Sequence, residues 1–310
     1  MLRLWISVAL VLTALFAIAT LALSREWEAA TESVSWQVVF SSSAIEIGFG
    51  AFITDMNGET IRPLSLGGIQ LTSPACSPDG SYLAFTVRET LSILNTGSAR
   101  ELWQWSEPTY AHLLTVSRDG RTAVLSGALH YAGDTQYGMW IIETTPFDFI
   151  IPSVQALRSA SSFDLSPDGK QIVFQSQEDD LYLVNADESD MRLLVANAAD
   201  PDWSPDGSMI AFSANWDGAF NIYIMDVSRR LWAQVTYLEQ AAPNGGNVEP
   251  SWSPDSNQIS FISLDERRSR LGNLYLIRAD GSGQRHLLNA PPVTSACILR
   301  TRPVLLTADS

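Results

Sequence analysis

The chain has 310 residues, with 19 basic and 34 acidic side chains and a net charge of −15. An acidic surface of this kind repels nucleic-acid backbones, so nucleic acid is not an expected partner. Hydrophobic residues make up 46% of the sequence, which is enough for a sizeable core in a chain of this length.

The N-terminal segment is strongly apolar. Residues 4–23 form a run of 20 residues without a charge, long enough to cross a bilayer as a helix. Arg3 precedes the run, and the charge balance around it favours an N-terminus inside and the rest of the chain outside. A cleaved signal peptide is the alternative, because Ala17-Ile18-Ala19 has the small-x-small form of a cleavage site.

We therefore expect a signal anchor or signal peptide over residues 1–24 and a short tether over residues 25–33. If the segment is not cleaved, residues 4–23 attach the protein to a membrane. Either interpretation sends the remaining chain out of the cytoplasm, to a periplasmic or cell-surface location.

Similar segments recur along the rest of the chain. Each contains a Ser-Pro-Asp-Gly turn or a variant of it, followed by an apolar run that suits a strand covered on both faces. A sixth, eroded copy covers residues 294–307 and aligns with residues 72–86. The turn serines of the other copies are Ser77, Ser117, Ser166, Ser204 and Ser253.

Two further apolar strands follow the turn unit in each copy, which gives four strands per repeat. A sheet of this size buries both faces only by stacking on its neighbours in a ring. We therefore predict an all-β fold, a six-bladed β-propeller over residues 34–310, preceded by the N-terminal hydrophobic helix.

The repeats resemble the TolB-like, WD-like propeller family, whose hallmark is Trp-Ser-Pro-Asp-Gly followed by Ile-Ala-Phe and Ile-Tyr-x-Met-Asp strands. Residues 203–226 of this chain carry all three elements, and the resemblance covers residues 34–310. It implies a propeller that binds a protein or peptide within the cell envelope. The sequence lacks the separate N-terminal α/β domain of TolB itself.

Closure of the ring has to use both ends of the chain. Residues 36–42 have the pattern of a second strand, and so do residues 303–307, so the choice between them stays open. Cys76 and Cys297 take the place that Trp holds in other repeats. We expect unpaired core cysteines, since equivalent positions on adjacent blades usually lie too far apart for a disulfide. A bridge that locks the closure in an oxidising compartment is the alternative.

No catalytic residue, metal site or cofactor is expected. The three histidines, His112, His130 and His286, fall in different blades without the spacing of metal ligands. No G-x-S-x-G nucleophile motif occurs in the sequence. An enzyme is therefore the weaker hypothesis.

The blade topology indicates where a partner binds. The Ser-Pro-Asp-Gly turns share one face, here named the turn face, whereas the second-to-third loops and the blade-to-blade loops share the opposite loop face. The long loops lie on the loop face, and variable loops on a rigid scaffold are where binding usually occurs. The candidate binding residues on this face are His130, Tyr131, Asp134, Tyr137, Trp216, Asp217, Asn244, Asn247, Glu249, Arg267 and Arg268.

The function predicted from the sequence is a non-enzymatic, monomeric, extracytoplasmic propeller, membrane-tethered or exported, that serves as a protein- or peptide-binding scaffold in the cell envelope. The alternative is a carbohydrate-binding or carbohydrate-lyase propeller that uses the loop face. The repeats also resemble those of oligogalacturonate lyases, which implies a histidine-rich metal site in that case.

Overall fold

The computed structural model describes residues 35–301, apart from residues 45–47, 67–68, 71, 88–89, 97–99, 106–108, 132–133, 145–146, 151–158, 239–244 and 265–271. The predicted N-terminal helix and the apolar run at 303–307 lie outside the described residues. Within the described part of the chain, no helix is long and apolar enough to span a membrane.

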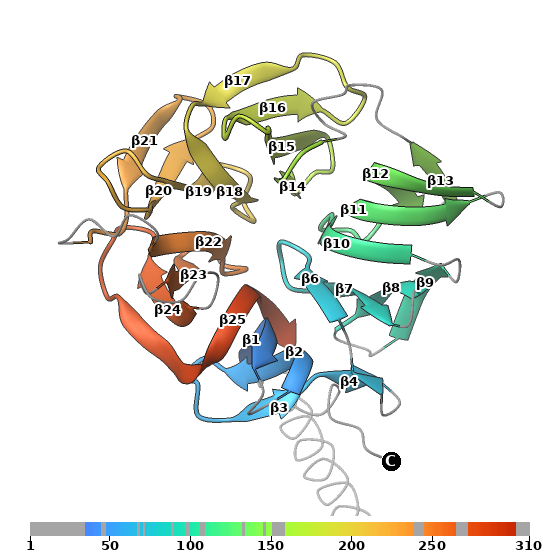
Figure 1. The fold of residues 1–310 in the computed structure, drawn as a ribbon, viewed down its shortest axis with the longest axis horizontal. Helices are drawn as coiled ribbons and strands as arrows, with labels where there is room; N and C mark the ends of the chain where they lie inside the picture. Colours follow the sequence, from blue (N-terminus) through green and yellow to red (C-terminus); the bar gives the residue numbers. More distant parts are fainter. Residues whose placement is uncertain are drawn as a thin grey trace, which may run out of the picture. The chain divides into compact units, whose positions relative to one another are not determined.

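The described strands form blades of four antiparallel strands that follow one another around a ring (Figure 1). Blade 1 contains β6 (Thr72–Cys76), β7 (Tyr82–Val87), β8 (Thr90–Asn95) and β9 (Arg100–Trp105). Blade 2 contains β10 (Thr109–Val116), β11 (Thr122–Tyr131), β12 (Asp134–Thr144) and β13 (Phe147–Ile150). Blade 3 contains β14 (Ser162–Leu165), β15 (Gln171–Gln175), β16 (Leu181–Asn185) and β17 (Arg192–Val195).

Blade 4 contains β18 (Ala198–Trp203), β19 (Met209–Ala214), β20 (Asn221–Asp226) and β21 (Leu231–Gln234). Blade 5 contains β22 (Gly246–Trp252), β23 (Gln258–Leu264), β24 (Gly272–Arg278) and the first part of β25 (Arg285–Thr301). Blade 6 combines the last part of β25 with β1 (Ser35–Ala44), β2 (Gly48–Asp55) and β3 (Ile61–Pro63). A two-stranded ribbon, β4 (Ser65–Leu66) and β5 (Ile69–Gln70), joins blade 6 to blade 1. The predicted six-bladed, all-β propeller is thus confirmed.

The seams between blades form the hydrophobic core. Between blades 3 and 4, for example, Val173 and Leu183 pack in one cluster with Trp203 and Phe212. Trp203 is 4% exposed and Trp252 is 5% exposed, so both repeat tryptophans fill seams. Each blade therefore depends on its neighbours to bury its faces.

The ring closes through one long strand. β25 is hydrogen-bonded to β24 on one side and to β1 on the other. Blade 6 therefore takes its innermost strand from the C-terminal part of the chain and its three outer strands from the N-terminal part. This arrangement makes residues 36–42 the second strand of blade 6, which answers the question that the sequence leaves open.

The expectation of two unpaired cysteines is wrong. Cys76 and Cys297 form a disulfide, and their Cα atoms are 5.9 Å apart. Innermost strands converge on the ring axis, so equivalent positions of neighbouring blades come closer there than elsewhere in a blade. The separation falls inside the usual range for a disulfide, and the bond joins the innermost strands of blades 1 and 6.

The Ser-Pro-Asp-Gly turns act as repeated corners between first and second strands. In blade 4, the Ser204 hydroxyl donates to Asp206 Oδ1 (2.7 Å) and accepts the Met209 N–H (2.8 Å). Gly207 takes a positive φ of 75° to complete the turn, a conformation that glycine adopts without steric cost. The same pair of serine contacts recurs at Ser77, Ser117, Ser166 and Ser253.

Candidate functional site

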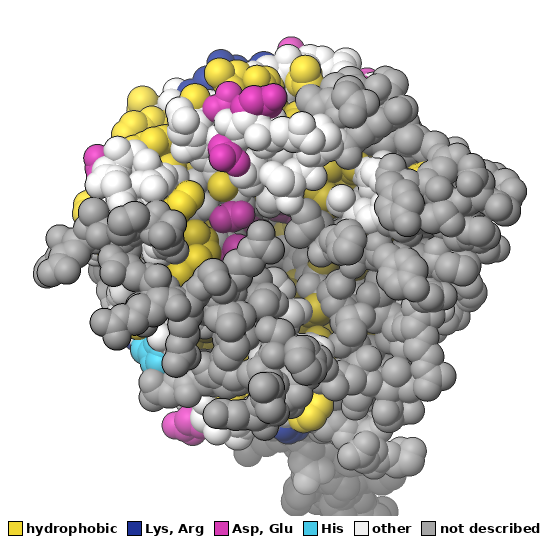
Figure 2. Space-filling view, viewed as in Figure 1, with side chains coloured by type: hydrophobic (Ala, Val, Ile, Leu, Met, Phe, Trp, Pro, Cys, Tyr) yellow, Lys and Arg dark blue, Asp and Glu magenta, His cyan; other side chains and the backbone are white. Residues whose placement is uncertain are grey.

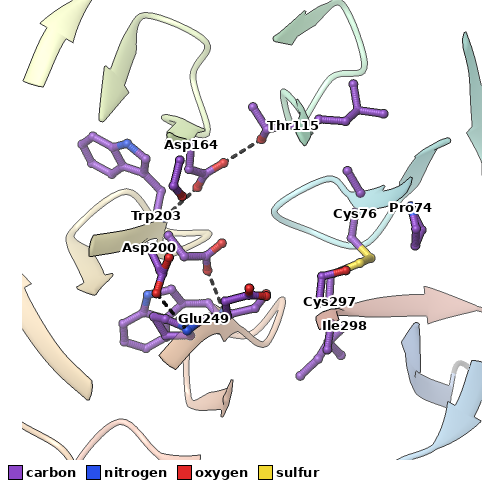
Figure 3. A pocket seen from close by; sticks show the side chains of 18 of the residues that line it. Pro74, Cys76, Thr115, Asp164, Asp200, Trp203, Glu249, Cys297 and Ile298 are labelled. Atoms are coloured by element: carbon purple, nitrogen blue, oxygen red, sulfur yellow. Dashed lines mark hydrogen bonds between the residues drawn. A yellow bond between two sulfur atoms is a disulfide. The ribbon is translucent and has the colours of Figure 1, made fainter. Parts of the chain in front are cut away.

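A cavity of about 620 Å³ occupies the middle of the ring. The innermost strands of all blades contribute to its wall, and the close-up shows side chains that point into it (Figure 3). Carboxylates gather on one side of this channel, and the Cys76–Cys297 disulfide lies on the opposite side. The described lining contains no Lys, Arg or His.

Two aspartates deep in the channel tie neighbouring blades together. Asp164 accepts hydrogen bonds from the Thr115 hydroxyl (2.6 Å) and from the backbone N–H of Trp203 (2.7 Å). Asp202, which holds the same repeat position one blade later, accepts the N–H of Trp252 at 2.7 Å. These bonds fix the innermost strands of blades 2 to 5 against each other, so we assign both aspartates a structural role in the channel wall.

Asp200 and Glu249 lie nearer the loop face, in the middle of β18 and β22, where the pairing with the next strand shifts its register. They hold the same repeat position in adjacent blades, four residues before the turn serine. Both have a positive φ, 51° at Asp200 and 49° at Glu249, which is uncommon for residues other than glycine. Asp200 Oδ2 accepts the Ser213 hydroxyl (2.7 Å) and the backbone N–H of Glu249 (3.3 Å). Strained backbone of this kind concentrates at functional sites.

The channel disfavours the charged form of its carboxyl groups. Burial raises the pKa of Asp164 to about 6, and burial followed by the charge of Asp164 raises the pKa of Asp202 well above its ordinary value. Burial also raises the pKa of Asp200, against hydrogen bonds that favour its carboxylate.

Glu249 combines solvent access with a raised pKa. The residue is exposed at the channel mouth, yet the protein wall around its carboxyl group excludes much of the surrounding water. This desolvation, with the nearby charge of Asp200, raises the pKa of Glu249 to about 8. A cationic group entering the mouth would favour the ionised form, because an opposite charge lowers a carboxyl pKa.

The predicted loop-face residues separate into two places. Glu249 lines the channel, whereas Trp216 and Asp217 lie in the hairpin between β19 and β20. Trp216 is half-buried, and its ring centroid lies 4.5 Å from Tyr223 and 4.7 Å from Trp232. Asn247 is 2% exposed and its N–H donates to Phe220 O at 2.8 Å, so it holds the start of β22 in place.

The remaining predicted site residues are described only in part or not at all. His130 pairs with Thr135 and Tyr131 pairs with Asp134 where β11 turns into β12, and Tyr137 pairs with Ala128 on the same two strands. The structure describes only the backbone of these paired residues. Three predicted residues lie outside the described ranges: Asn244, Arg267 and Arg268.

Sequence reasoning missed the channel residues Asp164, Asp200 and Asp202. The signal for them is the stretch before the turn serine, which reads Asp-Pro-Asp-Trp at 200–203 and Glu-Pro-Ser-Trp at 249–252. This stretch identifies a site only when the ring is known, because the ring brings equivalent positions of two successive repeats side by side. No set of three His, Cys, Asp or Glu side chains among the described residues is arranged to hold a metal ion.

The fold is a six-bladed β-propeller with a central channel. Residues 149–276 match the model of the TolB beta propeller domain, which confirms the resemblance read from the repeats. No curated protein matches the sequence.

Solved structures share this fold. A TolB candidate protein from Agrobacterium tumefaciens matches 84% of this chain over 91% of its own length, at 18% identity and a TM-score of 0.58. TolB from Acinetobacter baumannii matches 86% of the chain at 17% identity and a TM-score of 0.62, and 66% of that protein is covered. An oligogalacturonate lyase in complex with manganese matches 77% of the chain and 70% of its own length, at 14% identity and a TM-score of 0.53.

Proposed function

We propose that the chain is a non-enzymatic, extracytoplasmic propeller that binds a protein or peptide partner at the loop-face mouth of its central channel. The observation that carries the proposal is the acidic mouth formed by Asp200 and Glu249, with no Lys, Arg or His in the described channel lining. Carboxyl groups with raised pKa values in a concave, low-dielectric site favour an entering cation, because its charge lowers their pKa and pairs with the ionised form. A basic side chain of the partner is therefore the group we expect to enter the mouth.

The two ends of the channel differ, and the difference supports entry of the partner from the loop face. At the turn face, the Arg118 guanidinium of blade 2 donates to the carbonyl of Pro205 in blade 4. Pro205 belongs to the channel lining, so this contact spans part of the turn-face opening. At the other end, the exposed Glu249 offers a carboxyl group without a described cationic partner.

The disulfide supports the proposed location. Disulfides persist in oxidising compartments such as the periplasm and the cell exterior, and they are rare in the reducing cytosol. The Cys76–Cys297 bond joins the innermost strands of the first and last repeats. An extracytoplasmic propeller is consistent with that chemistry and with the apolar residues 4–23.

Photo-cross-linking from the two faces tests the proposal. A photo-reactive phenylalanine derivative replaces Ser161, an exposed lining residue just before β14 at the loop-face mouth, so that Glu249 stays in place. In a matched variant it replaces Asp168 in a turn-face corner, and both proteins are full chains expressed in cells. We expect a discrete cross-linked partner from position 161 and none from position 168. Equal products from both positions would contradict a loop-face site.

A parallel measurement tests the alternative function, a propeller that binds or cleaves carbohydrate. Thermal melting of the full chain with manganese and with oligogalacturonate compares Glu249→Gln with the unmodified protein. A melting shift that needs Glu249 would assign the mouth to a metal or an acidic sugar rather than to a protein. Unchanged melting with both additives is the result that the protein-binding proposal predicts.

A further inference from the structure

The outer strand of blade 4 differs from the other outer strands in composition. An exposed strand edge offers unpaired backbone groups to another chain, and proteins commonly protect such edges with charges or proline. β21 reads Leu-Trp-Ala-Gln, without a charge or a proline. The other described outer strands contain at least one of these residues: Arg62 and Pro63 in β3, Arg100 and Glu101 in β9, Asp148 in β13, Arg192 in β17, and Arg285 in β25.

β21 also carries an exposed apolar surface. Leu231 is 67% exposed and Trp232 is 55% exposed. Figure 2 shows hydrophobic side chains gathered on this rim of the ring, over β20 and β21. The Trp232 ring rests on Trp216 at 4.7 Å and on Tyr223 at 5.7 Å. These contacts hold the indole in place and leave its outer surface to solvent.

Among the described residues, no strand pairs with the outer edge of β21. β21 is the last strand of its sheet, and its inner side pairs with β20 through Ala233 opposite Ile224 and Trp232 opposite Met225. Val235 N–H donates to Ile222 O at 2.8 Å. Because antiparallel residues alternate between bonded and non-bonded pairs, the N–H and C=O groups of Trp232 and Gln234 point away from β20. The Gln234 C=O accepts the Tyr237 hydroxyl at 3.3 Å, which leaves the Trp232 N–H and C=O and the Gln234 N–H to a partner strand.

Opposite charges lie at the two ends of this edge. Arg230 immediately precedes β21 and is exposed, and Arg229 Nη1 lies 3.6 Å from Asp226 Oδ2. At the other end, Gln234 pairs with Tyr223. Asp217 lies near that end, because it follows Trp216, whose ring centroid is 4.5 Å from that of Tyr223.

We propose that the edge of β21 is a second docking site, which takes an extended segment of a partner protein as an additional strand of blade 4. The segment has a large apolar side chain beside Trp232, an acidic residue at the Arg230 end and a basic residue at the Asp217 end. Main-chain hydrogen bonds supply affinity in this mode of recognition, and alternate side chains supply specificity. The site goes beyond the proposed function, because it uses the rim of the ring and not the channel.

A synthetic peptide tests the site on the full chain. The probe has Lys at its N-terminus, Phe and Val at alternate positions and Glu at its C-terminus, which matches the charges of β21 in an antiparallel pairing. We expect the peptide to slow hydrogen exchange at the Trp232 and Gln234 amides. Trp232→Lys should weaken peptide binding by at least about tenfold, since it places a charge on the edge and removes the apolar contact.

The matched control is Leu193→Lys, because Leu193 is 50% exposed on β17, the outer strand of blade 3. We expect this variant to bind the peptide like the unmodified chain. Gln234→Pro is the second variant: it removes an outward N–H and leaves the inner ladder intact, as an edge proline does. It should also abolish the slowed exchange at Trp232.

Three results would overturn the proposal. The first is exchange at Trp232 that stays unchanged at saturating peptide, and the second is an equal loss of binding in Leu193→Lys. The third is self-association of the full chain that Trp232→Lys removes, which would assign the edge to a second copy. Glu249→Gln alters the channel mouth alone and should leave peptide binding unchanged, so failure of this site and failure of the channel site are distinguishable.

Discussion

The acidic residues form two groups with opposite electrostatic behaviour. In the turn corners, partial burial of Asp206 is outweighed by hydrogen bonds from Ser204 and Ser208, which hold its pKa below the ordinary value. In the channel, desolvation dominates and raises the pKa of Asp164 to about 6 and that of Glu249 to about 8. The same residue type therefore stabilises the corners as an anion and opposes folding in the channel as an anion.

These shifts predict how stability depends on pH. A corner aspartate stabilises the fold above its unfolded pKa, about 3.9, and this contribution is lost as the pH falls through its lower folded pKa. A channel carboxyl with a raised pKa binds its proton more tightly in the folded state. Its ionisation therefore costs stability progressively as the pH rises from about 4 towards the folded pKa.

We expect the melting temperature of the full chain to fall between about pH 5 and pH 8, where the corner aspartates are already ionised. Glu249→Gln should make this decline less steep, because the amide has no proton to lose. Asp168→Asn is the control, since it removes a corner carboxylate and should lower the curve with little change in slope. Parallel curves for Glu249→Gln and the unmodified chain would contradict the assignment.

At the scale of elements, the sequence carries most of the information needed for the blades. Pro205 and Gly207 define a turn, and an apolar run of fixed length follows each turn, so strand positions and seam residues follow from local chemistry. The pairing of β25 with β1 depends on residues at opposite ends of the chain. Two segments, residues 36–42 and 303–307, have the sequence pattern of the second strand that closes the ring, so the sequence does not choose between them. The mouth formed by Asp200 and Glu249 could not be predicted for the same reason, since only ring closure places successive repeats side by side.

The seam tryptophans provide the prediction at this scale. Trp203→Ala and Trp252→Ala should each lower the free energy of unfolding by about 3–5 kcal/mol, because both remove large buried side chains. Trp216 is only half-buried, so Trp216→Ala should cost less, about 1–2 kcal/mol. Denaturant titration monitored by circular dichroism compares the three variants. Equal losses in all three would place Trp216 in the core.

At the scale of the whole molecule, the disulfide holds the ring closed. It links residues 221 positions apart in the sequence, and cross-links that close long loops reduce the entropy of the unfolded chain most. The double variant Cys76→Ser, Cys297→Ser should lose about 2–5 kcal/mol of stability. Guanidinium unfolding with and without a reductant measures the loss. Reduction should lower the free energy of unfolding of the unmodified chain and leave that of the double variant unchanged. If the reductant changes the unfolding of neither protein, the bond has no stabilising role.

The most direct test measures how tightly the full chain holds the partner captured by cross-linking at position 161. Glu249→Lys reverses the charge at the loop-face mouth, and Asp168→Lys makes the same change of charge in a turn-face corner. We expect Glu249→Lys to weaken partner binding by at least about tenfold, since like charges then face each other in the mouth, and Asp168→Lys to bind like the unmodified chain. Equal affinity of all three proteins would contradict a binding site at the channel mouth.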